Sequence, residues 1–556
     1  MTELVSATGE ETDRRQRDAA GIGRGALVIG GLTALARIFG LVRTLVFSQT
    51  VGATCLGSAY STANQVPNLV NELVVGGVLA SAMVPVLARS AELSETDPAE
   101  KARVGLIFSA LLTWTILLLV PFAVVIAVSA GPIASVLNPA NASAACPHAD
   151  VVAVTANMLR VFAPQIVLYG LSVVFFGLLQ AYRRFAGYAL APLVYSLVLI
   201  AAYLAFAPIG KGLPLAKLSG SAQLVLSLGT TLGVAALVVV AAVPTSRLRL
   251  RLRPTLRLPP GVARRAGGLA MVGLVEVVAS DLSAVVVIAL ANGRGTTGAL
   301  VIFNYASQVF NTLNAVFAVA VFVSAFPVLS ARDGEQFDAT CAGSTRAVTW
   351  VACLGMAAMV AVAVPAAHVL AKQADQKSQL VTAFILFAPG LLGTAVIANL
   401  SRAMLAIGRL RVAATAVAGS WLLVMAAQAV LAEIVPADLV VGALGLGYSV
   451  GQIAAAIPLV IITRRIRGGA AIQGVGRATV AGLIAASVGA AVGLAIAVEL
   501  PASHKLLDAG VGVLAASAAI VAFGLVAFLT DDGDLRAIAG KVFGMLKMRW
   551  SRAGTS

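Results

Sequence analysis

The chain has 556 residues, of which 59% are hydrophobic and only 11% are charged, and its mean hydropathy is +0.95. A soluble domain carries roughly 25% charged residues, so this composition excludes a water-soluble globular protein. The apolar stretches are about 20 residues long and do not alternate strictly, which predicts an all-α polytopic membrane protein rather than a β-barrel.

The N-terminal 24 residues are polar and charged, and no short apolar core with a cleavage site follows them. They therefore predict a cytoplasmic tail and not a signal peptide. About fourteen apolar segments follow, each a candidate transmembrane helix. Their expected ranges are 25–51, 57–88, 104–130, 150–182, 186–208, 218–244, 267–292, 298–330, 347–371, 379–405, 412–432, 438–462, 478–499 and 507–529.

The distribution of Lys and Arg predicts the orientation of these spans. With the N-terminus inside and Arg402 assigned to the inner interface, the inner side holds 30 Lys and Arg residues, the outer loops hold six, and Arg37, Arg43 and Arg160 lie within spans, which accounts for all 39. Such an excess on the inner side is the positive-inside rule, and it places both termini in the cytoplasm. The net charge of +15 is then explained by topology and contact with anionic lipid, and nucleic-acid binding is not expected.

The most basic inner loop divides the chain into two halves. It runs from Thr245 to Arg265 and contains seven Arg and no acid. The predicted organisation is a tail (1–24), an N-lobe of six spans (25–244), the basic cytoplasmic loop (245–266), a C-lobe of six spans (267–462), two further spans (463–529) and a cytoplasmic tail (530–556).

A short repeat links the two lobes. The stretch QVPNLVN at 65–71 returns 243 residues later as QVFNTLN at 308–314, and both copies then lead to Ser-Ala and Pro-Val-Leu. The copies lie in the second and eighth spans and run in the same direction. This predicts a parallel repeat, with two lobes related by a pseudo-twofold axis along the membrane normal.

Both repeated spans place amide side chains on one helical face. These amides either bond neighbouring helices, at about 0.6–2 kcal/mol per hydrogen bond, or line a water-filled cavity between the lobes. Because the two stripes match, we favour the cavity. The polar candidates for substrate binding are Asn68, Asn71, Glu72, Gln308, Asn311 and Asn314, beside Asn64 and Asn304.

Charged residues inside the spans are the sharper signal. Arg37 lies about twelve residues into the first span, roughly 18 Å along its axis, where an Arg costs at least about 2.5–3.5 kcal/mol. Arg37 and Arg43 are candidates for holding an anionic substrate, because guanidinium clamps phosphate. The alternatives are an ion pair of Arg37 with Glu72 or another acid, and snorkelling of Arg43 to the outer interface. In the seventh span, Glu276 and Asp281 could bind a coupling cation or proton, or pair with Arg.

The sequence contains no P-loop, nucleophile elbow or metal-binding pattern, so we expect no cofactor, no metal and no enzymatic activity. Its four cysteines form no CxxC motif. Cys55 and Cys146 both fall in expected outer loops, in a compartment that permits disulfides. The sequence leaves open a bridge between them or two free thiols.

Three stretches resemble one known family, the MurJ (MviN) lipid II flippases of the multidrug/oligosaccharidyl-lipid/polysaccharide exporter superfamily. They are ALARIFGLVRTLVFSQTVGA, ANQVPNLVNELVVGGVLASAMVPVLARS and NYASQVFNTLNAVFAVAVFVSAFPVLSA. The resemblance implies a bacterial plasma-membrane protein with two lobes around a cationic cavity. It also implies that Arg37 and Arg43 hold the lipid II pyrophosphate and that the helices within 463–529 form a groove for the lipid tail.

Other positions depart from the family pattern. The usual charged residues are replaced by Ser58, Asn71-Glu72, Gly76-Gly77 and Ser307-Gln308. The function that the resemblance implies is translocation of lipid II from the inner to the outer leaflet by alternating access, in the company of membrane lipids and cell-wall synthesis proteins. The alternatives are a flippase for polysaccharide repeat units, a cation-coupled drug exporter of the same superfamily, and a non-transporting scaffold.

Overall fold

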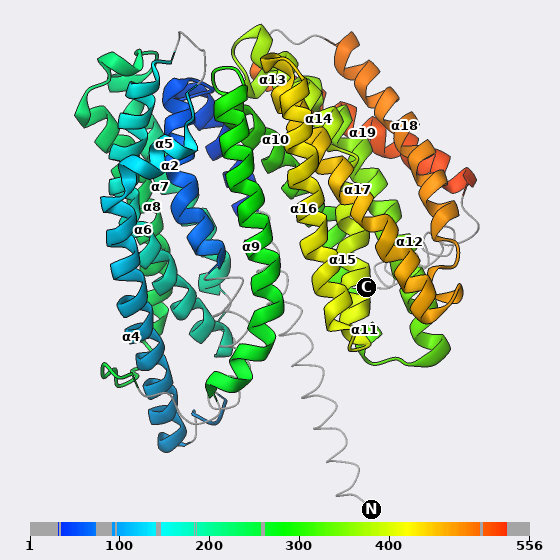
Figure 1. The fold of residues 1–556 in the computed structure, drawn as a ribbon, viewed down its shortest axis with the longest axis horizontal. Helices are drawn as coiled ribbons and strands as arrows, with labels where there is room; N and C mark the ends of the chain where they lie inside the picture. Colours follow the sequence, from blue (N-terminus) through cyan, green and yellow to red (C-terminus); the bar gives the residue numbers. More distant parts are fainter. Residues whose placement is uncertain are drawn as a thin grey trace, which may run out of the picture. The chain divides into compact units, whose positions relative to one another are not determined.

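The computed structural model describes residues 32, 35–73, 92–94, 97–140, 146–182, 184, 186–256, 262–500 and 504–530. All regular elements of this part are helices, as Figure 1 shows. Twelve helical segments among them are long and apolar enough to cross a membrane. The chain is therefore an all-α polytopic membrane protein, as the composition predicts.

Residues 35–50 form the first described helical run. The elements that follow in the first half are α2 (Cys55–Glu72), α4 (Pro98–Val128), α5 (Ala130–Leu137), α6 (His148–Ala181), α7 (Ala186–Gly210), η2 (Leu215–Lys217), α8 (Gly220–Ser246) and α9 (Val262–Arg294).

The second half contains α10 (Ala299–Asn314), η3 (Ala315–Val319), α11 (Ala320–Ser330), α12 (Gly334–Ala361), α13 (Ala363–Leu370), α14 (Ala374–Phe387), α15 (Gly390–Ala406), α16 (Leu410–Ile434), η4 (Ala437–Leu439), α17 (Val440–Arg467), η5 (Ala470–Ile472), α18 (Val475–Glu499) and α19 (Lys505–Thr530).

Each of the twelve spans expected from residue 104 onwards has a counterpart among these segments. The expected spans 25–51 and 57–88 are described only in part, and Gly76, Gly77 and the two tails lie outside the described residues. The count of fourteen stays a prediction.

One span begins well before its expected edge. The ninth span was expected at 347, but α12 begins at Gly334. Its polar first turns are exposed at Gly334, Glu335 and Gln336 and are held by protein contacts on one side only. Phe337 and Cys341 are buried, and Asp338 accepts a hydrogen bond from Nε of Arg467 at 2.8 Å.

The chain forms two compact units, which we describe separately. Unit 1 contains Met1–Val51, Ala63–Ala134 and Val152–Val277, and unit 2 contains Gly52–Thr62, Ser135–Val151 and Val278–Ser556. The divisions fall inside α2, α5, α6 and α9. Two short segments from the first half of the chain, Gly52–Thr62 and Ser135–Val151, therefore belong to unit 2 together with the second half. The predicted lobe boundaries remain a prediction.

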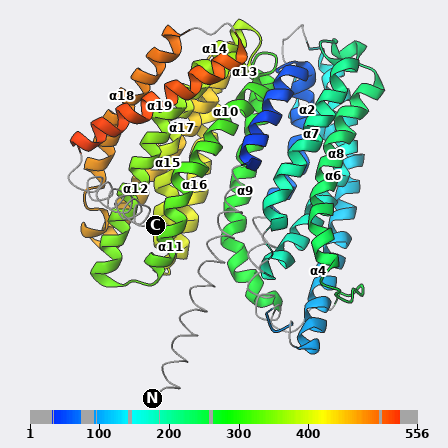
Figure 2. The same cartoon turned by 180° about the vertical axis from the view of Figure 1, so that it is seen from behind.

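Close helix packing in unit 2 depends on small residues. A Cβ atom at Gly451 of α17 would lie 2.4 Å from the Cα atom of Val424 of α16, and one at Gly489 of α18 would lie 2.8 Å from the carbonyl oxygen of Ala519 of α19. Figure 2 shows α18 and α19, in orange and red, lying against each other. Small residues at such crossings let helix backbones approach, which is how helices associate in lipid.

Candidate functional site

The two arginines of the first span have different surroundings. Arg37 is exposed, and its side chain makes no hydrogen bond or ion pair with another described residue. The ion pair with Glu72 that the sequence left open is therefore not formed. Arg43 is half-buried, and its guanidinium carbon lies 5.2 Å from the centroid of the Tyr195 ring on α7. A cation–π contact of this kind holds the guanidinium in place.

A second tyrosine connects Arg43 to the polar stripe of α2. The hydroxyl of Tyr169 on α6 donates a hydrogen bond to Oδ1 of Asn68 at 3.0 Å. Tyr169 also interacts with the side chains of Tyr195 and Arg43. We call these four residues, Arg43, Asn68, Tyr169 and Tyr195, the tyrosine cluster. It brings two predicted binding residues together inside unit 1.

The sequence did not single out the two tyrosines. A polar ring in an apolar span is a signal, since the chain has only eight tyrosines. Which neighbour each ring reaches depends on how α6 and α7 are rotated against α2, and a single sequence does not give those rotations.

The polar side chains of α10 that match those of α2 in the repeat have different surroundings. Asn311 is exposed, and Gln308 and Asn314 are half-buried. Among the described residues, Oδ1 of Asn314 and Oγ of Ser307 are buried without a hydrogen-bond partner. Such atoms are costly unless water or a ligand reaches them. Oδ1 of Asn64 on the α2 stripe is also buried without a hydrogen-bond partner from the residues that the structure describes. The water-filled cavity stays a prediction.

A π-helical turn, η3, follows Asn314 directly. Turns of this kind are frequent at functional sites. In the other copy of the repeat, Leu73 directly follows Glu72 and is also π-helical. The 243-residue offset matches Leu73 to Val316 inside η3. The parallel repeat of the two lobes stays a prediction.

The remaining predicted residues do not form one site within a unit. Asn71 is half-buried, Glu72 and Glu276 are exposed, and Asp281 is 7% exposed. The candidates on α10 belong to unit 2 and those on α2 to unit 1. Their meeting across a cavity stays a prediction.

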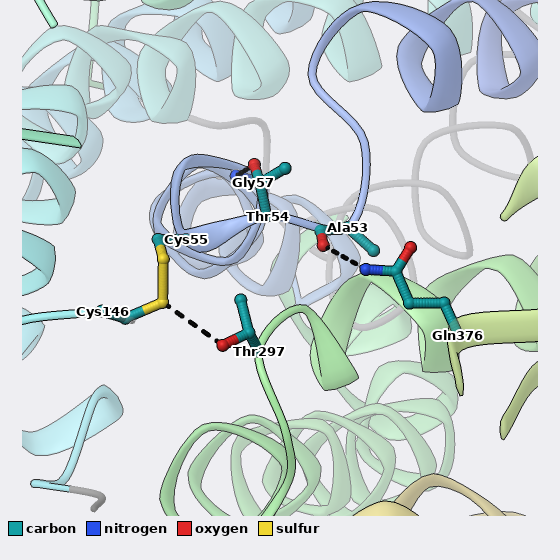
Figure 3. The surroundings of a disulfide bond; sticks show 7 residues. All are labelled: Ala53, Thr54, Cys55, Gly57, Cys146, Thr297 and Gln376. Carbon is teal, nitrogen blue, oxygen red and sulfur yellow. Dashed lines mark hydrogen bonds between the residues drawn. A yellow bond between two sulfur atoms is a disulfide. The ribbon is translucent and has the colours of Figure 1, made fainter. Parts of the chain in front are cut away.

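A disulfide joins Cys55 and Cys146 in unit 2, with their Cα atoms 5.6 Å apart. The bridge that the sequence left open is therefore present. Figure 3 shows its surroundings: Sγ of Cys146 lies 3.6 Å from Oγ1 of Thr297, and Nε2 of Gln376 donates to the carbonyl oxygen of Ala53 at 2.8 Å. We call this region the disulfide junction.

Asn292 completes the disulfide junction. Its Nδ2 donates to Oγ1 of Thr62, the carbonyl oxygen of Leu137 and Oδ1 of Asn138 at 2.9, 2.9 and 3.2 Å. The side-chain amide of Asn292, near the end of α9, thereby connects α2 at Thr62 with the end of α5 at Leu137 and Asn138. Gly298, at a φ of +85°, packs so closely that a Cβ atom there would lie 2.6 Å from the Ala53 backbone.

A small hollow lies at the disulfide junction. Its lining includes Cys55, Cys146, His148, Asn292 and Thr297. None of the predicted substrate-binding residues lines it. We therefore interpret the junction as a structural closure of unit 2 and not as a binding site.

Comparison with known proteins decides the family. A family model described as lipid II flippase MurJ matches residues 47–523. The chain belongs to the lipid II flippase MurJ family. The resemblance seen in the three sequence stretches is thereby confirmed.

Individual members of the MurJ family align over shorter regions. Lipid II flippase MurJ of Burkholderia cenocepacia is 31% identical over 193 residues, which are 33% of this chain and 34% of that protein. A probable lipid II flippase MurJ of Rhizobium tropici is 26% identical over 179 residues, 32% of each chain. The alignments thus span about one third of the length of these curated relatives.

Solved structures agree with the fold. A lipid II flippase MurJ in an inward-closed conformation matches with a TM-score of 0.68 at 15% identity, covering 89% of this chain and 98% of that one. An inward-facing multidrug resistance transporter of the MATE family and MOP superfamily matches with a TM-score of 0.61 at 14% identity, covering 81% and 99%. At these identities the likeness shows the fold alone.

Proposed function

We propose that this chain translocates lipid II, the undecaprenyl-pyrophosphate-linked disaccharide-pentapeptide, from the inner to the outer leaflet of the bacterial plasma membrane. The observation that carries the proposal is the MurJ family match over residues 47–523, on a fold shared with solved transporters. Both termini lie in the cytoplasm on this proposal. Transport makes and breaks no covalent bond and needs no cofactor.

The binding step rests on the first span. Arg37 and Arg43 bind the pyrophosphate, since a guanidinium fork matches phosphate oxygens in pairs. Arg43 is held against Tyr195, so it loses less side-chain freedom when it binds an anion. Asn68, fixed by Tyr169, provides a neutral donor beside this charge.

The transport step requires that contacts form on one side of the cavity while they break on the other. We assign the disulfide junction to the outer closure. There Asn292 and Gln376 hold the segments around Cys55 and Cys146 through side-chain hydrogen bonds that can exchange with water. The inside-negative potential favours return of an empty, positively charged site, at about 2.3 kcal/mol per charge per 100 mV. Glu276 and Asp281 are the proposed residues for a coupling cation or proton.

Depletion of the protein in its native cells tests the proposal. We expect lipid II to accumulate in the inner leaflet, detected by mass spectrometry of extracted lipids and by protection from an externally added lipid II-cleaving enzyme. A catalogue of all undecaprenyl-linked lipids is the control. Accumulation of a different polysaccharide-linked lipid, with lipid II unchanged, would replace the proposal with the repeat-unit flippase.

A further inference from the structure

The loop after α8 packs against helix α4 of unit 1. Residues 249–256 lack helical structure and run along α4. The backbone N–H of Arg253 donates to Oγ of Ser109 at 3.1 Å, and that of Thr255 donates to Oγ1 of Thr113 at 3.3 Å. Nε1 of Trp114 donates to the carbonyl oxygen of Leu256 at 3.2 Å. We call residues 247–256 the arginine arm.

The face of α4 that receives the arginine arm suits an extended backbone. Gly105, Ser109 and Thr113 are four residues apart, so they lie on one helical face. A Cβ atom at Gly105 would lie 3.1 Å from the carbonyl oxygen of Arg251, so the missing side chain makes room for the arm. The two hydroxyls accept its N–H groups, which a helix surface of apolar side chains would leave unpaired.

The arginine arm separates leucines from arginines. Leu248 and Leu250 pack into the core that Val104, Phe108 and Leu178 form between α4 and α6. The side chains of Arg247, Arg249, Arg251 and Arg253 are all exposed. The arm therefore presents four positive charges away from the core.

These four charges are not neutralised by the protein. No hydrogen bond or ion pair within the described part of the chain uses any of the four guanidinium groups. The acids at the start of α4 are engaged elsewhere. Asp97 accepts from the N–H of Ala99 at 2.8 Å, and Glu100 pairs with Arg103 at 3.5 Å.

Backbone strain at one position supports a use for these side chains. Arg249 has a φ of 49°, the left-handed region that glycine enters without penalty and arginine does not. Residues held in this region cluster at functional sites.

The position along α4 indicates what the charges meet. The apolar part of α4 begins near Val104, and the arginine arm covers Gly105 to Trp114, about 14 Å of helix at 1.5 Å per residue. Leu252 and Leu256 of the arm are 54% and 52% exposed. Exposed leucines next to arginines, at the polar end of a transmembrane helix, match the boundary between lipid headgroups and acyl chains.

We propose that the arginine arm is a binding site for anionic phospholipid headgroups of the surrounding bilayer. The arginines contact the phosphates, and Leu252 and Leu256 insert among the upper acyl carbons. On the orientation proposed above, this is the cytoplasmic leaflet. A free phosphate offers nothing to the leucines, and a nucleic acid would not explain their position beside a membrane span.

Retention of lipid by the purified full chain tests the proposal. The protein is exchanged into detergent micelles containing phosphatidylglycerol and phosphatidylcholine in equal amounts, and native mass spectrometry counts bound molecules of each. We expect selective retention of phosphatidylglycerol by the wild type. Each arginine near an anionic surface contributes about fivefold, so Arg251→Gln with Arg253→Gln lowers this selectivity about 25-fold.

A matched control removes the same charge elsewhere. Arg464 and Arg465 at the end of α17 are also exposed, and Arg464→Gln with Arg465→Gln is expected to lower the selectivity less than the arm variant does, because those two arginines are not arranged along an extended segment with exposed leucines. If both pairs have equal effects, the lipid responds to overall charge and the proposed site does not exist. Loss of binding that excess inorganic pyrophosphate reproduces, and that Leu252→Ala with Leu256→Ala does not alter, would show a phosphate site instead.

Arg249→Gly separates binding from folding. Glycine keeps the left-handed turn, so the thermal stability of the variant is expected to equal or exceed that of the wild type. Phosphatidylglycerol selectivity is expected to fall about fivefold. A stability loss with unchanged lipid selectivity would assign Arg249 a structural role and contradict the proposal at this residue.

Discussion

The two copies of the repeat have the same sequence pattern but different surroundings. In α2, Asn68 accepts a hydrogen bond from Tyr169, which also interacts with Arg43. At the matched position in α10, Asn311 is exposed. In the first copy, Asn68 is therefore connected to Arg43 through Tyr169, whereas in the second copy the amide of Asn311 is exposed.

The residue before each of these asparagines differs as well. Pro67 of α2 removes a backbone donor within the helix, whereas Phe310 of α10 stacks on Phe387 with ring centroids 4.4 Å apart and meets the edge of Tyr448 at 5.2 Å. The α2 copy therefore contacts polar side chains through Asn68, and the α10 copy is anchored by aromatic packing.

The largest expected effect comes from the charged side. Arg37→Ala should abolish transport while leaving insertion and folding intact, because the exposed guanidinium has no partner among the described residues and we propose that it binds the substrate. The measurement is growth of cells with the variant as the only copy, together with their lipid II content. Normal growth would contradict this assignment.

Arg37→Lys is the matched control for charge alone. It keeps the charge but loses the planar fork, so at most partial rescue is expected. Full rescue would mean that a point charge suffices and that bidentate binding of pyrophosphate is wrong.

The next effect is on stability and falls on the other copy. Phe310→Ala should lower the free energy of unfolding by about 3–5 kcal/mol, because it removes a fully buried ring from an aromatic stack. Pro67→Ala at the matched position should change it little. Thermal unfolding of both variants in the same detergent makes the comparison. Equal losses would show that the two copies are anchored alike.

The disulfide is a further difference between the copies, since the residue 243 positions after Cys55 is Gly298. Replacing Cys55 and Cys146 together with Ser should lower the free energy of unfolding by about 2–4 kcal/mol. Alkylation of the unreduced, denatured wild type followed by intact-mass measurement should add two labels, at Cys341 and Cys353. Four labels would rule out the bridge.

The smallest expected effect separates the two asparagines. Tyr169→Phe removes the hydrogen bond to Asn68, worth about 1 kcal/mol, and should slow transport about fivefold. Asn311→Ala should have a smaller effect if the open amide contacts water. Solvent labelling of cysteines placed at 68 and 311 is the companion measurement. We expect faster labelling at 311, and equal rates would remove the distinction between the copies.

The membrane-spanning helices were predictable because length and apolarity alone specify them. The early start of α12 has a clear cause. Its first turns, from Gly334, are too polar to be recognised as part of a span, but Arg467 donates a hydrogen bond to the carbonyl oxygen of Gly334 and lies over the Phe337 ring. Hydropathy measures affinity for lipid and does not register helical turns that are held by contacts with other parts of the protein.

The candidate site was predictable only in part. Arg43 and Asn68 were singled out as rare polar residues in lipid, but the tyrosines that join them depend on helix rotation. The arginine arm is similar. Its alternation is visible in RLRLRLR at 247–253, but the partner face at Gly105, Ser109 and Thr113 is ordinary in sequence and gains meaning only when the two segments meet.

The bond between Cys55 and Cys146 also records how the chain was threaded into the membrane. The bacterial cytosol keeps thiols reduced, so a bridge formed in cells requires both residues to reach the oxidising side. The expected second and third spans separate them, and two crossings return the chain to that same side. With one expected span before Cys55, an oxidised bridge detected in cells would place the N-terminus inside, independently of the Lys and Arg distribution. The fraction of bridged molecules in living cells is thus a chemical measure of correct insertion.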